Sequence, residues 1–266
     1  MGKIISIFNQ KGGVGKTTTS INLAAGIGRK NKSVLLVDLD PQGNTTSGLG
    51  VNKTEIEGSL YDLINEDSEF SDVKITTSSK NLDLMPAGIE LAGLEIELSK
   101  SDSWSNVLKD ILDSIKDDYD FIILDCPPSL GIISLMGLIS SDYVLIPIQS
   151  EFYALEGTGQ LLETIDMVKE NYNPTLEILG VVMVMHDSRT RLSSDVVAEV
   201  KNVFKDLVFK TVINRNVRLA EAPSYGMSIF DYDKISKGAW NYRSLTKEVL
   251  DRIGEKWRKK ADLIEA

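Results

Sequence analysis

The sequence contains one cysteine, Cys126, and one histidine among its 266 residues. A single cysteine cannot close a disulfide within the chain, and one cysteine with one histidine argues against a zinc site or a cysteine–histidine catalytic pair. This cysteine usage suits a reducing cytoplasm. No apolar run approaches the roughly 18–20 residues that a membrane-spanning helix needs. The longest, residues 178–185, is typical of a buried strand.

Basic residues are also scarce relative to acidic ones. The chain has 29 Lys and Arg against 39 Asp and Glu, for a formal net charge of −10. That sign disfavours a generic nucleic-acid-binding protein. The charge is unevenly distributed, however, because residues 234–260 hold nine basic and three acidic residues. The composition therefore leaves room for a local basic face on an acidic chain.

Short apolar runs alternate with segments of helical period along the chain. The runs expected to form strands are 3–8, 33–38, 82–85, 121–125, 143–148, 178–184 and 211–213. The segments expected to form helices are 16–29, 59–66, 103–116, 130–140, 154–169, 193–205 and 236–257. Near-continuous apolar strands are typical of a sheet covered on both faces. The alternation predicts the α/β class, with a single doubly wound, mostly parallel sheet that gathers ligands at the carboxyl ends of its strands.

We expect one domain over residues 1–266, since no repeat, low-complexity tract or proline-rich linker interrupts the pattern. The last helix is predicted over about 236–260, packed on that domain. Its apolar stripe consists of residues spaced four apart, Leu245, Val249, Ile253 and Trp257. A stripe of this kind predicts core packing with a basic outer face, and we therefore expect no stable membrane association.

The stretch between the first strand and the first helix carries the clearest chemical signal. Residues 9–18 read Asn-Gln-Lys-Gly-Gly-Val-Gly-Lys-Thr-Thr. A glycine-rich turn at the start of a helix exposes backbone N–H groups that cradle phosphates, a lysine supplies a point charge, and the following threonine supplies a hydroxyl for Mg²⁺. Gln10 stands where the ordinary motif has glycine, and Lys11 opens the tight run. Because Lys11 cannot easily fold back onto its own loop, we expect it to reach the phosphates of a partner subunit.

This is the deviant Walker A motif, and the chain resembles the ParA/Soj family of chromosome- and plasmid-partitioning ATPases. The resemblance continues in order through residues 37–44, 121–129, 187–190 and 215–226. The phosphate loop alone marks a wider group with MinD-like and nitrogenase-iron-protein-like members, whereas the last two stretches narrow it to the partitioning branch. The resemblance implies a P-loop NTPase fold that uses ATP and Mg²⁺. The residues expected to hold the nucleotide phosphates are Lys11, Gly12, Gly13, Val14, Gly15, Lys16, Thr17 and Thr18.

Three aspartates are expected to serve metal binding and hydrolysis. Asp125 closes an apolar strand, from which a carboxylate can reach Mg²⁺ through water while Thr17 binds the metal directly. Asp38 and Asp40 flank Leu39, so their side chains point to opposite faces of a strand. By resemblance, Asp40 orients the attacking water and Asp38 supports the waters on the metal. The alternative is that either residue only caps the following turn. Lys11, Lys16 and Asp40 are thus the candidate catalytic residues.

The resemblance also indicates where the base and DNA would bind. Asn216 is expected to border adenine, since its amide can both donate and accept hydrogen bonds. Many family members have proline at the position of Asn214, which leaves the contact at 214 open. Arg189 and Arg218 lie where the family places arginines that hold DNA, although an isolated surface arginine is more often only solvated. With no helix-turn-helix pattern, we expect backbone contacts to duplex DNA without sequence specificity.

The function implied is a slow ATPase of the cytoplasm and nucleoid. An ATP-bound sandwich homodimer would bind non-specific double-stranded DNA, and a DNA-bound partner of the ParB/Spo0J type would stimulate hydrolysis and dissolve the dimer. A MinD-like membrane-positioning ATPase is the main alternative. A carrier like the nitrogenase iron protein would need paired cysteines, which one cysteine cannot supply. A non-catalytic scaffold is disfavoured by Lys16 and Asp40.

Overall fold

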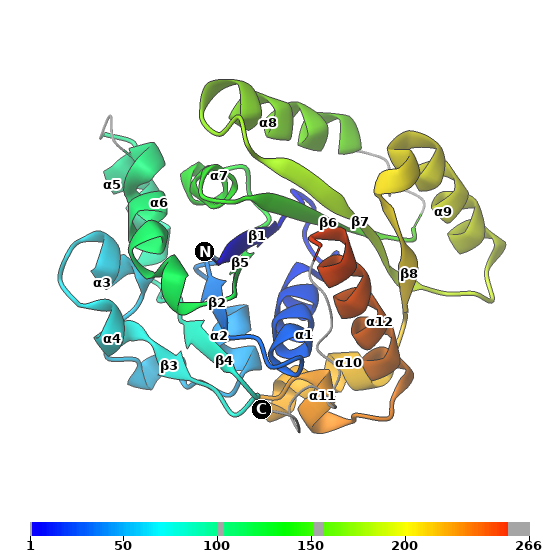
Figure 1. Cartoon of the computed structure of the whole chain (residues 1–266), viewed down its shortest axis with the longest axis horizontal. Coiled ribbons are helices and arrows are strands. Elements are labelled where there is room, and N and C mark those ends of the chain that lie inside the picture. The colour runs from blue at the N-terminus through cyan, green and yellow to red at the C-terminus, as the bar shows by residue number, and fades with distance from the viewer. Residues whose placement is uncertain (1, 101–103, 152–156, 255–266) are drawn as a thin grey trace, which may run out of the picture.

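One eight-stranded sheet organises the chain (Figure 1). The computed structural model describes residues 2–100, 104–151 and 157–254. The strands stand in the order β3-β4-β2-β5-β1-β6-β7-β8, and only the short β3 runs antiparallel to its neighbour among the described residues. Their bounds are β1 Lys3–Ile7, β2 Val34–Asp38, β3 Ile75–Thr76, β4 Leu82–Met85, β5 Phe121–Asp125, β6 Tyr143–Gln149, β7 Glu177–His186 and β8 Val208–Asn214. The predicted fold class is confirmed.

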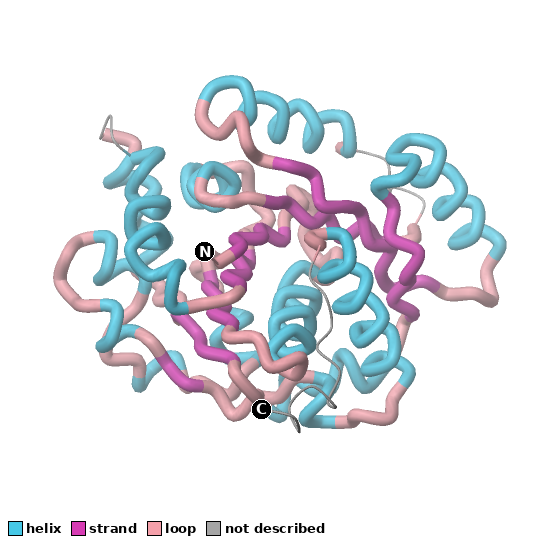
Figure 2. The backbone as a smooth tube through the Cα atoms, in the orientation of Figure 1, coloured by secondary structure: helices cyan, strands magenta, loops and turns pink. Residues whose placement is uncertain are grey.

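Helices cover both faces of this sheet (Figure 2). The longer ones are α1 Lys16–Gly28, α5 Leu91–Leu98, α6 Trp104–Ile115, α7 Ile132–Ile139, α8 Thr158–Asn171, α9 Arg191–Phe204 and α12 Lys237–Arg252. The short ones are α2 Asn44–Gly48, α3 Leu60–Ile64, α4 Phe70–Val73, α10 Val217–Glu221 and α11 Ile229–Tyr232. Alternate residues of each central strand enter two separate cores, as Ile4 and Ile5 do. One core lies under α5 to α9, and the other lies under α1 and α10 to α12.

Several short elements were not predicted. They are β3, α2, α4, α10 and α11, and the longer helix α5 was not predicted either. β8 extends from Val208 to Asn214, longer than the predicted run 211–213, because its partly polar residues still complete the sheet edge against β7. Residues 66–81 contain α4 and β3.

The last described helix, α12, packs on β8 and α1. Its stripe residues Leu245 and Val249 are fully buried. The helix ends at Arg252, earlier than the predicted 257–260, and Gly254 adopts a φ of 83° that a right-handed helix cannot continue. Trp257 and the other residues from 255 to 266 lie outside the described residues, so the single-domain assignment over 1–266 stays a prediction. No helix in the described ranges has both the length and the apolar character needed to cross a membrane.

Candidate active site

The phosphate loop emerges where three parallel strands end together. In the sheet register Ile7 of β1 and Asp38 of β2 both lie opposite Asp125 of β5. The loop after β1 leads directly into α1, and Gly13 and Gly15 adopt φ values of 74° and 75°. Side chains rarely tolerate these left-handed angles, so glycine is required at both positions. A Cβ added at Gly12 or Gly13 would meet no atom within 4 Å, which leaves the cradle open for a ligand.

Lys16, the first residue of α1, points into this cradle. Its side chain is buried, and Nζ donates a hydrogen bond to the Lys11 carbonyl at 2.9 Å. Burial lowers the pKa of Lys16, while the charges of Asp125, Cys126 and Asp40 act to raise it. An ammonium group held in a buried site is stable only beside compensating groups. The site therefore favours anionic ligands next to Lys16.

Asp125 is surrounded by hydroxyl groups. Its Oδ2 accepts hydrogen bonds from the Thr17 hydroxyl at 2.9 Å and the Thr45 hydroxyl at 2.6 Å, and its Oδ1 accepts one from Ser20 at 2.8 Å. Burial raises the pKa of Asp125, and the three hydroxyl donors act against that effect. Carboxylate and hydroxyl oxygens are the ligands that Mg²⁺ prefers, and Thr17 and Asp125 lie together as predicted. Sequence reasoning missed Thr45 and Ser20; of the two, only Ser20 had a signal, its position three residues after Thr17 on α1.

Asp38 and Asp40 both make turn contacts. Asp38 accepts hydrogen bonds from the backbone and hydroxyl of Thr46, each at 2.8 Å, and from the Asp40 backbone at 3.2 Å. Complete burial, with the nearby Asp125, raises the pKa of Asp38 to about 7. Asp40 accepts a hydrogen bond from the Gln42 backbone through Oδ1 at 2.9 Å, and its Oδ2 has no hydrogen bond to the described residues. The turn-capping alternative thus describes Asp38 well, and its metal role stays a prediction.

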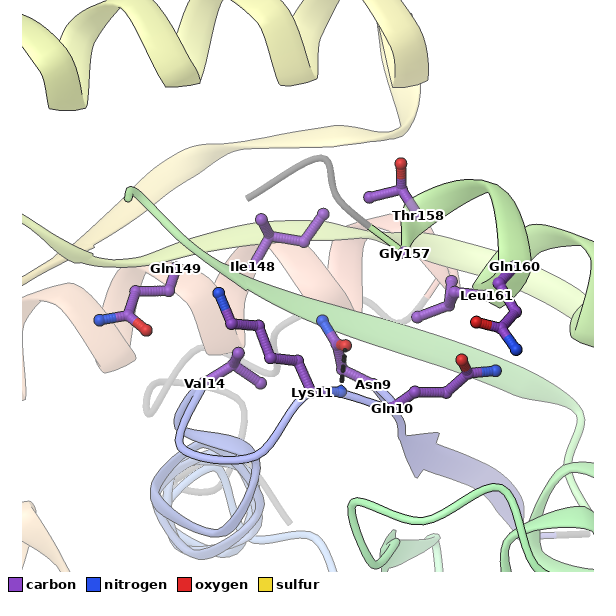
Figure 3. Close-up of a pocket in the computed structure, with 10 residues that line it drawn as sticks. All are labelled: Asn9, Gln10, Lys11, Val14, Ile148, Gln149, Gly157, Thr158, Gln160 and Leu161. Atoms are coloured by element: carbon purple, nitrogen blue, oxygen red, sulfur yellow. Dashed lines mark hydrogen bonds between the residues drawn. The ribbon is translucent and has the colours of Figure 1, made fainter. Parts of the chain in front are cut away.

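Lys11 points away from its own loop. The side chain is exposed and extends toward the carboxyl end of β6, in a cavity of about 460 Å³ that Val14, Ile148 and Gln149 also line (Figure 3). The Asn9 side chain accepts a hydrogen bond from the Lys11 backbone at 2.9 Å. Lys11 forms no ion pair with any described residue. Its charge is therefore available to a group outside this chain.

A second cavity of about 200 Å³ lies behind the loop, between the ends of β7 and β8. Asn216 lines it, although its Oδ1 accepts a hydrogen bond from the Arg218 backbone at 2.8 Å, which leaves only the amide N–H groups for a ligand. Asn214 is tied to α12, since its backbone and side-chain nitrogens lie 3.2 and 3.4 Å from Asn241 Oδ1. The cavity also includes Met185, which sequence reasoning missed.

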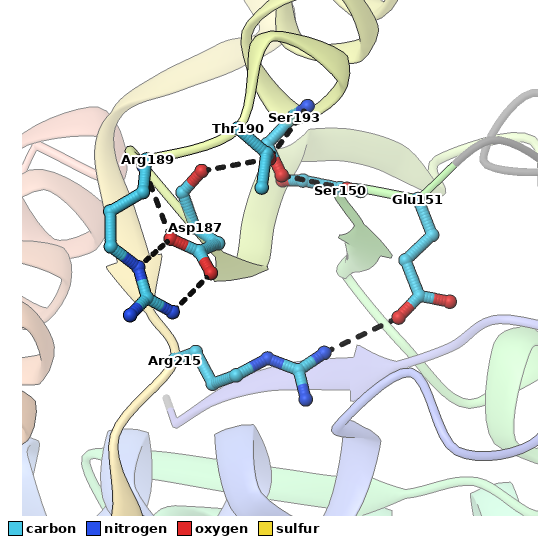
Figure 4. A network of polar contacts seen from close by, with 7 residues as sticks. All are labelled: Ser150, Glu151, Asp187, Arg189, Thr190, Ser193 and Arg215. Carbon is cyan, nitrogen blue, oxygen red and sulfur yellow. Dashed lines mark hydrogen bonds and ion pairs between the residues drawn. The ribbon is translucent and has the colours of Figure 1, made fainter.

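The two arginines predicted to hold DNA are paired with carboxylates. Arg189 makes two parallel contacts with Asp187, at 2.8 and 2.6 Å, and this pairing lowers the pKa of Asp187 (Figure 4). Arg218 lies 2.9 Å from Glu221 and 3.6 Å from Asp233. The Arg189 side chain is still 86% exposed, and solvent-exposed pairs of this kind contribute little to stability. The arginines can therefore exchange these partners for other anions.

Sequence reasoning did not single out Arg215, which lies on the same surface. It extends from the end of β8 past Asp187 to Glu151, where the two charged groups are 3.3 Å apart (Figure 4). Its charge helps to lower the pKa of Asp187. Arg189 and Arg215 thus converge on one surface from β7 and β8.

Known proteins resemble the chain over nearly its full length. A family model described as an AAA domain matches residues 2–178. The sporulation initiation inhibitor protein Soj of Bacillus subtilis is 53% identical over 94% of this chain and 98% of its own. The chromosome partitioning protein ParA of Myxococcus xanthus is 46% identical over 95% of this chain and 89% of its own. The chain belongs to the Soj/ParA family of chromosome partitioning ATPases.

A solved structure with a different name shares the family's fold. A crystal structure of cobyrinic acid a,c-diamide synthase from Mycobacterium smegmatis, with bound ATP analogue and magnesium, is 35% identical. It superposes with a TM-score of 0.85 over 96% of each chain. The likeness supports the nucleotide site more than any particular biological role, because one fold serves many functions.

Proposed function

We propose that this Soj/ParA-type chain is a slow, Mg²⁺-dependent ATPase whose ATP-bound dimer partitions DNA. Two subunits enclose two ATP molecules, and the dimer binds duplex DNA without sequence specificity. A DNA-bound partner of the ParB/Spo0J type stimulates hydrolysis, which separates the subunits and releases the DNA. The protein acts in the cytoplasm, at the nucleoid.

The residues of the site have distinct proposed roles. The phosphates lie over the loop 11–18, with Lys16 Nζ turned from the Lys11 carbonyl to the terminal phosphates. Thr17 and Asp125 would hold Mg²⁺, which would supply positive charge to neutralise the phosphate oxygens. Asp40 orients the attacking water through Oδ2, which no described residue engages, and Asn216 borders the base.

The main support for the proposed dimer is that the Lys11 side chain, next to Gly12, points outward from its own loop. Lys11 is exposed, unpaired with the described residues and extended away from its own loop (Figure 3). Gly12 has no left-handed φ, and a Cβ added there would meet no atom within 4 Å, so the folded chain gives no reason for glycine at this position. A second subunit and its triphosphate, approaching this loop closely, would explain both features.

The test is Gly12→Val. The Cβ of the new side chain would meet no atom within 4 Å beyond its chain neighbours, so we expect a folded protein that binds ATP but stays monomeric, because a β-branched side chain holds the subunits apart. Light scattering with a non-hydrolysable ATP analogue measures the dimer, and equilibrium dialysis measures ATP binding. Gly93→Val on α5 is the matched control, since its Cβ would also have room, with the nearest atom at 3.9 Å. A full ATP dimer of Gly12→Val would show that Gly12 lies outside the interface.

The MinD-like alternative keeps the same chemistry and replaces DNA with a lipid surface. Co-sedimentation of the ATP-bound protein with liposomes, compared with retention on duplex DNA, separates the two functions. We expect retention on DNA alone.

A further inference from the structure

The acidity of the chain is concentrated in one region. Residues 54–118 hold 16 Asp and Glu and five Lys, whereas the rest of the chain holds 23 acidic and 24 basic residues. This region contains α3 to α6, which lie together beyond the β4 side of the sheet (Figure 1). The candidate nucleotide site and the proposed DNA-binding arginines lie elsewhere. The proposed function therefore leaves this acidic region without a role.

An apolar stripe crosses the acidic region on α5. The helix buries Leu91, Leu94 and Leu98 against the core. Its opposite side exposes Ala92, Gly93 and Ile96, and Ile89 precedes them in the turn that leads into the helix. The spacing 89, 92, 93 and 96 places these residues on one side. Ile89 is 78% exposed and Ile96 is 66% exposed, with Glu90 and Glu97 exposed beside them.

This helix also contacts the segment that follows Asp125. Glu95 Oε1 lies 3.4 Å from the backbone nitrogen of Ile133, in the first turn of α7. A carboxylate at a helix N-terminus stabilises that end of the helix. The chain from Asp125 to Gly131 connects α7 to the candidate metal site. A ligand on α5 can therefore influence the site through Glu95.

We propose that the α5 stripe is the docking surface for a basic amphipathic segment of a partner protein. The partner's apolar residues pack on Ile89, Ala92, Gly93 and Ile96, and its lysines or arginines face Glu90 and Glu97. Charge decides between the occupants: the acidic region repels DNA, anionic lipid and a second copy of itself, and attracts a cationic protein. The small Ala92 and Gly93 allow the partner backbone to come close. The inference deepens the proposed function, because such a segment would belong to the partner that stimulates hydrolysis.

The test uses a fluorescent peptide of about 18 residues, with leucines at helical spacing on one face and lysines elsewhere. Its binding to the full chain is followed by fluorescence anisotropy at moderate ionic strength. We expect Ile96→Ser and Ile89→Ser each to weaken binding by about fivefold, as loss of a central apolar contact does. Ile235→Ser is the matched control, since Ile235 is 79% exposed and lies outside the acidic region 54–118. A peptide with glutamate in place of lysine is expected not to bind.

Three outcomes would each overturn the docking surface. The affinity for the peptide could fall as much in Ile235→Ser as in the stripe variants, or it could stay unchanged in both stripe variants. The glutamate peptide could also bind as tightly as the lysine peptide. Self-association of the wild-type chain that Ile96→Ser abolishes would overturn it too, since a second copy would then be the occupant. ATP turnover and DNA retention without peptide are measured for the same proteins. If the wild type neither hydrolysed ATP nor retained DNA, the proposed function would be wrong. The peptide-binding measurements would still decide whether the α5 stripe is a docking surface.

Discussion

Carboxylates occur in two contrasting settings in this molecule. At the ends of β2 and β5, Asp38 and Asp125 are buried and accept hydrogen bonds from Thr17, Ser20, Thr45 and Thr46. Beyond the ends of β7 and β8, partly exposed carboxylates pair instead with exposed arginines, as Asp187 pairs with Arg189. In both settings the carboxylate oxygens have hydrogen-bond or ion-pair partners. The settings differ in the free energy that is lost when one of these partners is removed.

Burial sets that difference. A buried carboxylate that loses a hydrogen-bond donor cannot replace it with water, so the geometry of the buried group is rigid. In an exposed ion pair, water can replace one partner with little loss of free energy. The buried setting suits a site that must hold a metal and a water in fixed positions. The exposed setting suits the proposed role of the arginines, in which a guanidinium exchanges its carboxylate for a DNA phosphate.

The largest effect is expected at Asp40, next to the buried group. Asp40→Ala removes the carboxylate proposed to orient water, while the phosphate loop and Lys16 remain. We expect ATP turnover to fall by about 100-fold or more with ATP binding retained, so that the ATP dimer persists. Phosphate release and light scattering measure the two effects. Turnover at the wild-type rate would assign the role to Asp38 or to another group.

A smaller effect, on stability, is expected at Thr45. Thr45→Val keeps the shape of the side chain but removes the 2.6 Å hydrogen bond to buried Asp125. We expect the free energy of unfolding to fall by about 1–3 kcal/mol, as when a buried polar group loses its partner. Thr54→Val is the control, because the exposed Thr54 hydroxyl donates to Asn52 at 2.9 Å and should change stability by less than about 0.5 kcal/mol. Equal urea midpoints for both variants would contradict the contrast drawn from burial.

The two settings also differ in how much the sequence predicts. The strand alternation and the glycine spacing indicate the sheet and the phosphate loop, because both depend on local rules: Gly13 and Gly15 need the angles they adopt. Asp125 and Thr17 were predicted together through the motif. Thr45 was not predicted to contact Asp125, because the two residues are 80 positions apart and no sequence pattern indicates the contact.

The exposed setting was harder to foresee. Arg189 and Arg218 are placed by resemblance, but the carboxylates that hold them were not expected. Arg215 meets Glu151 across 64 positions, so only the packing of β7 between β6 and β8 brings them together. Helix α5 was missed because the stretch that contains it mixes buried leucines with exposed apolar residues and glutamates, which obscures the helical period. Local pattern predicts the elements, and tertiary contact decides their partners.

A moderate effect on DNA binding is expected from the exposed arginines. Arg189→Ala and Arg218→Ala should each weaken binding by roughly three- to tenfold on unrelated duplexes and reduce the salt dependence, because each removes a phosphate contact per subunit. ATP-driven dimerisation should persist. The measurement is a salt titration of DNA affinity with a non-hydrolysable ATP analogue, with Lys109→Ala on acidic α6 as control. Unchanged affinity and slope in both variants would exclude these arginines and direct attention to the basic residues 234–260.

The smallest effect separates two roles for the carboxylate beside Arg189. If Asp187 only occupies the arginine until a phosphate replaces it, Asp187→Asn frees the guanidinium, and DNA affinity should rise by about two- to threefold. If Asp187 instead holds Arg189 in the orientation that a phosphate needs, the same variant should lose affinity. Asp195→Asn removes an equal charge from the nearby α9, where Asp195 lies 3.7 Å from Arg191, and corrects for the general change in potential. Because the ion pair is exposed and exchangeable, we expect the first result, measured as the difference between the two variants at one salt concentration.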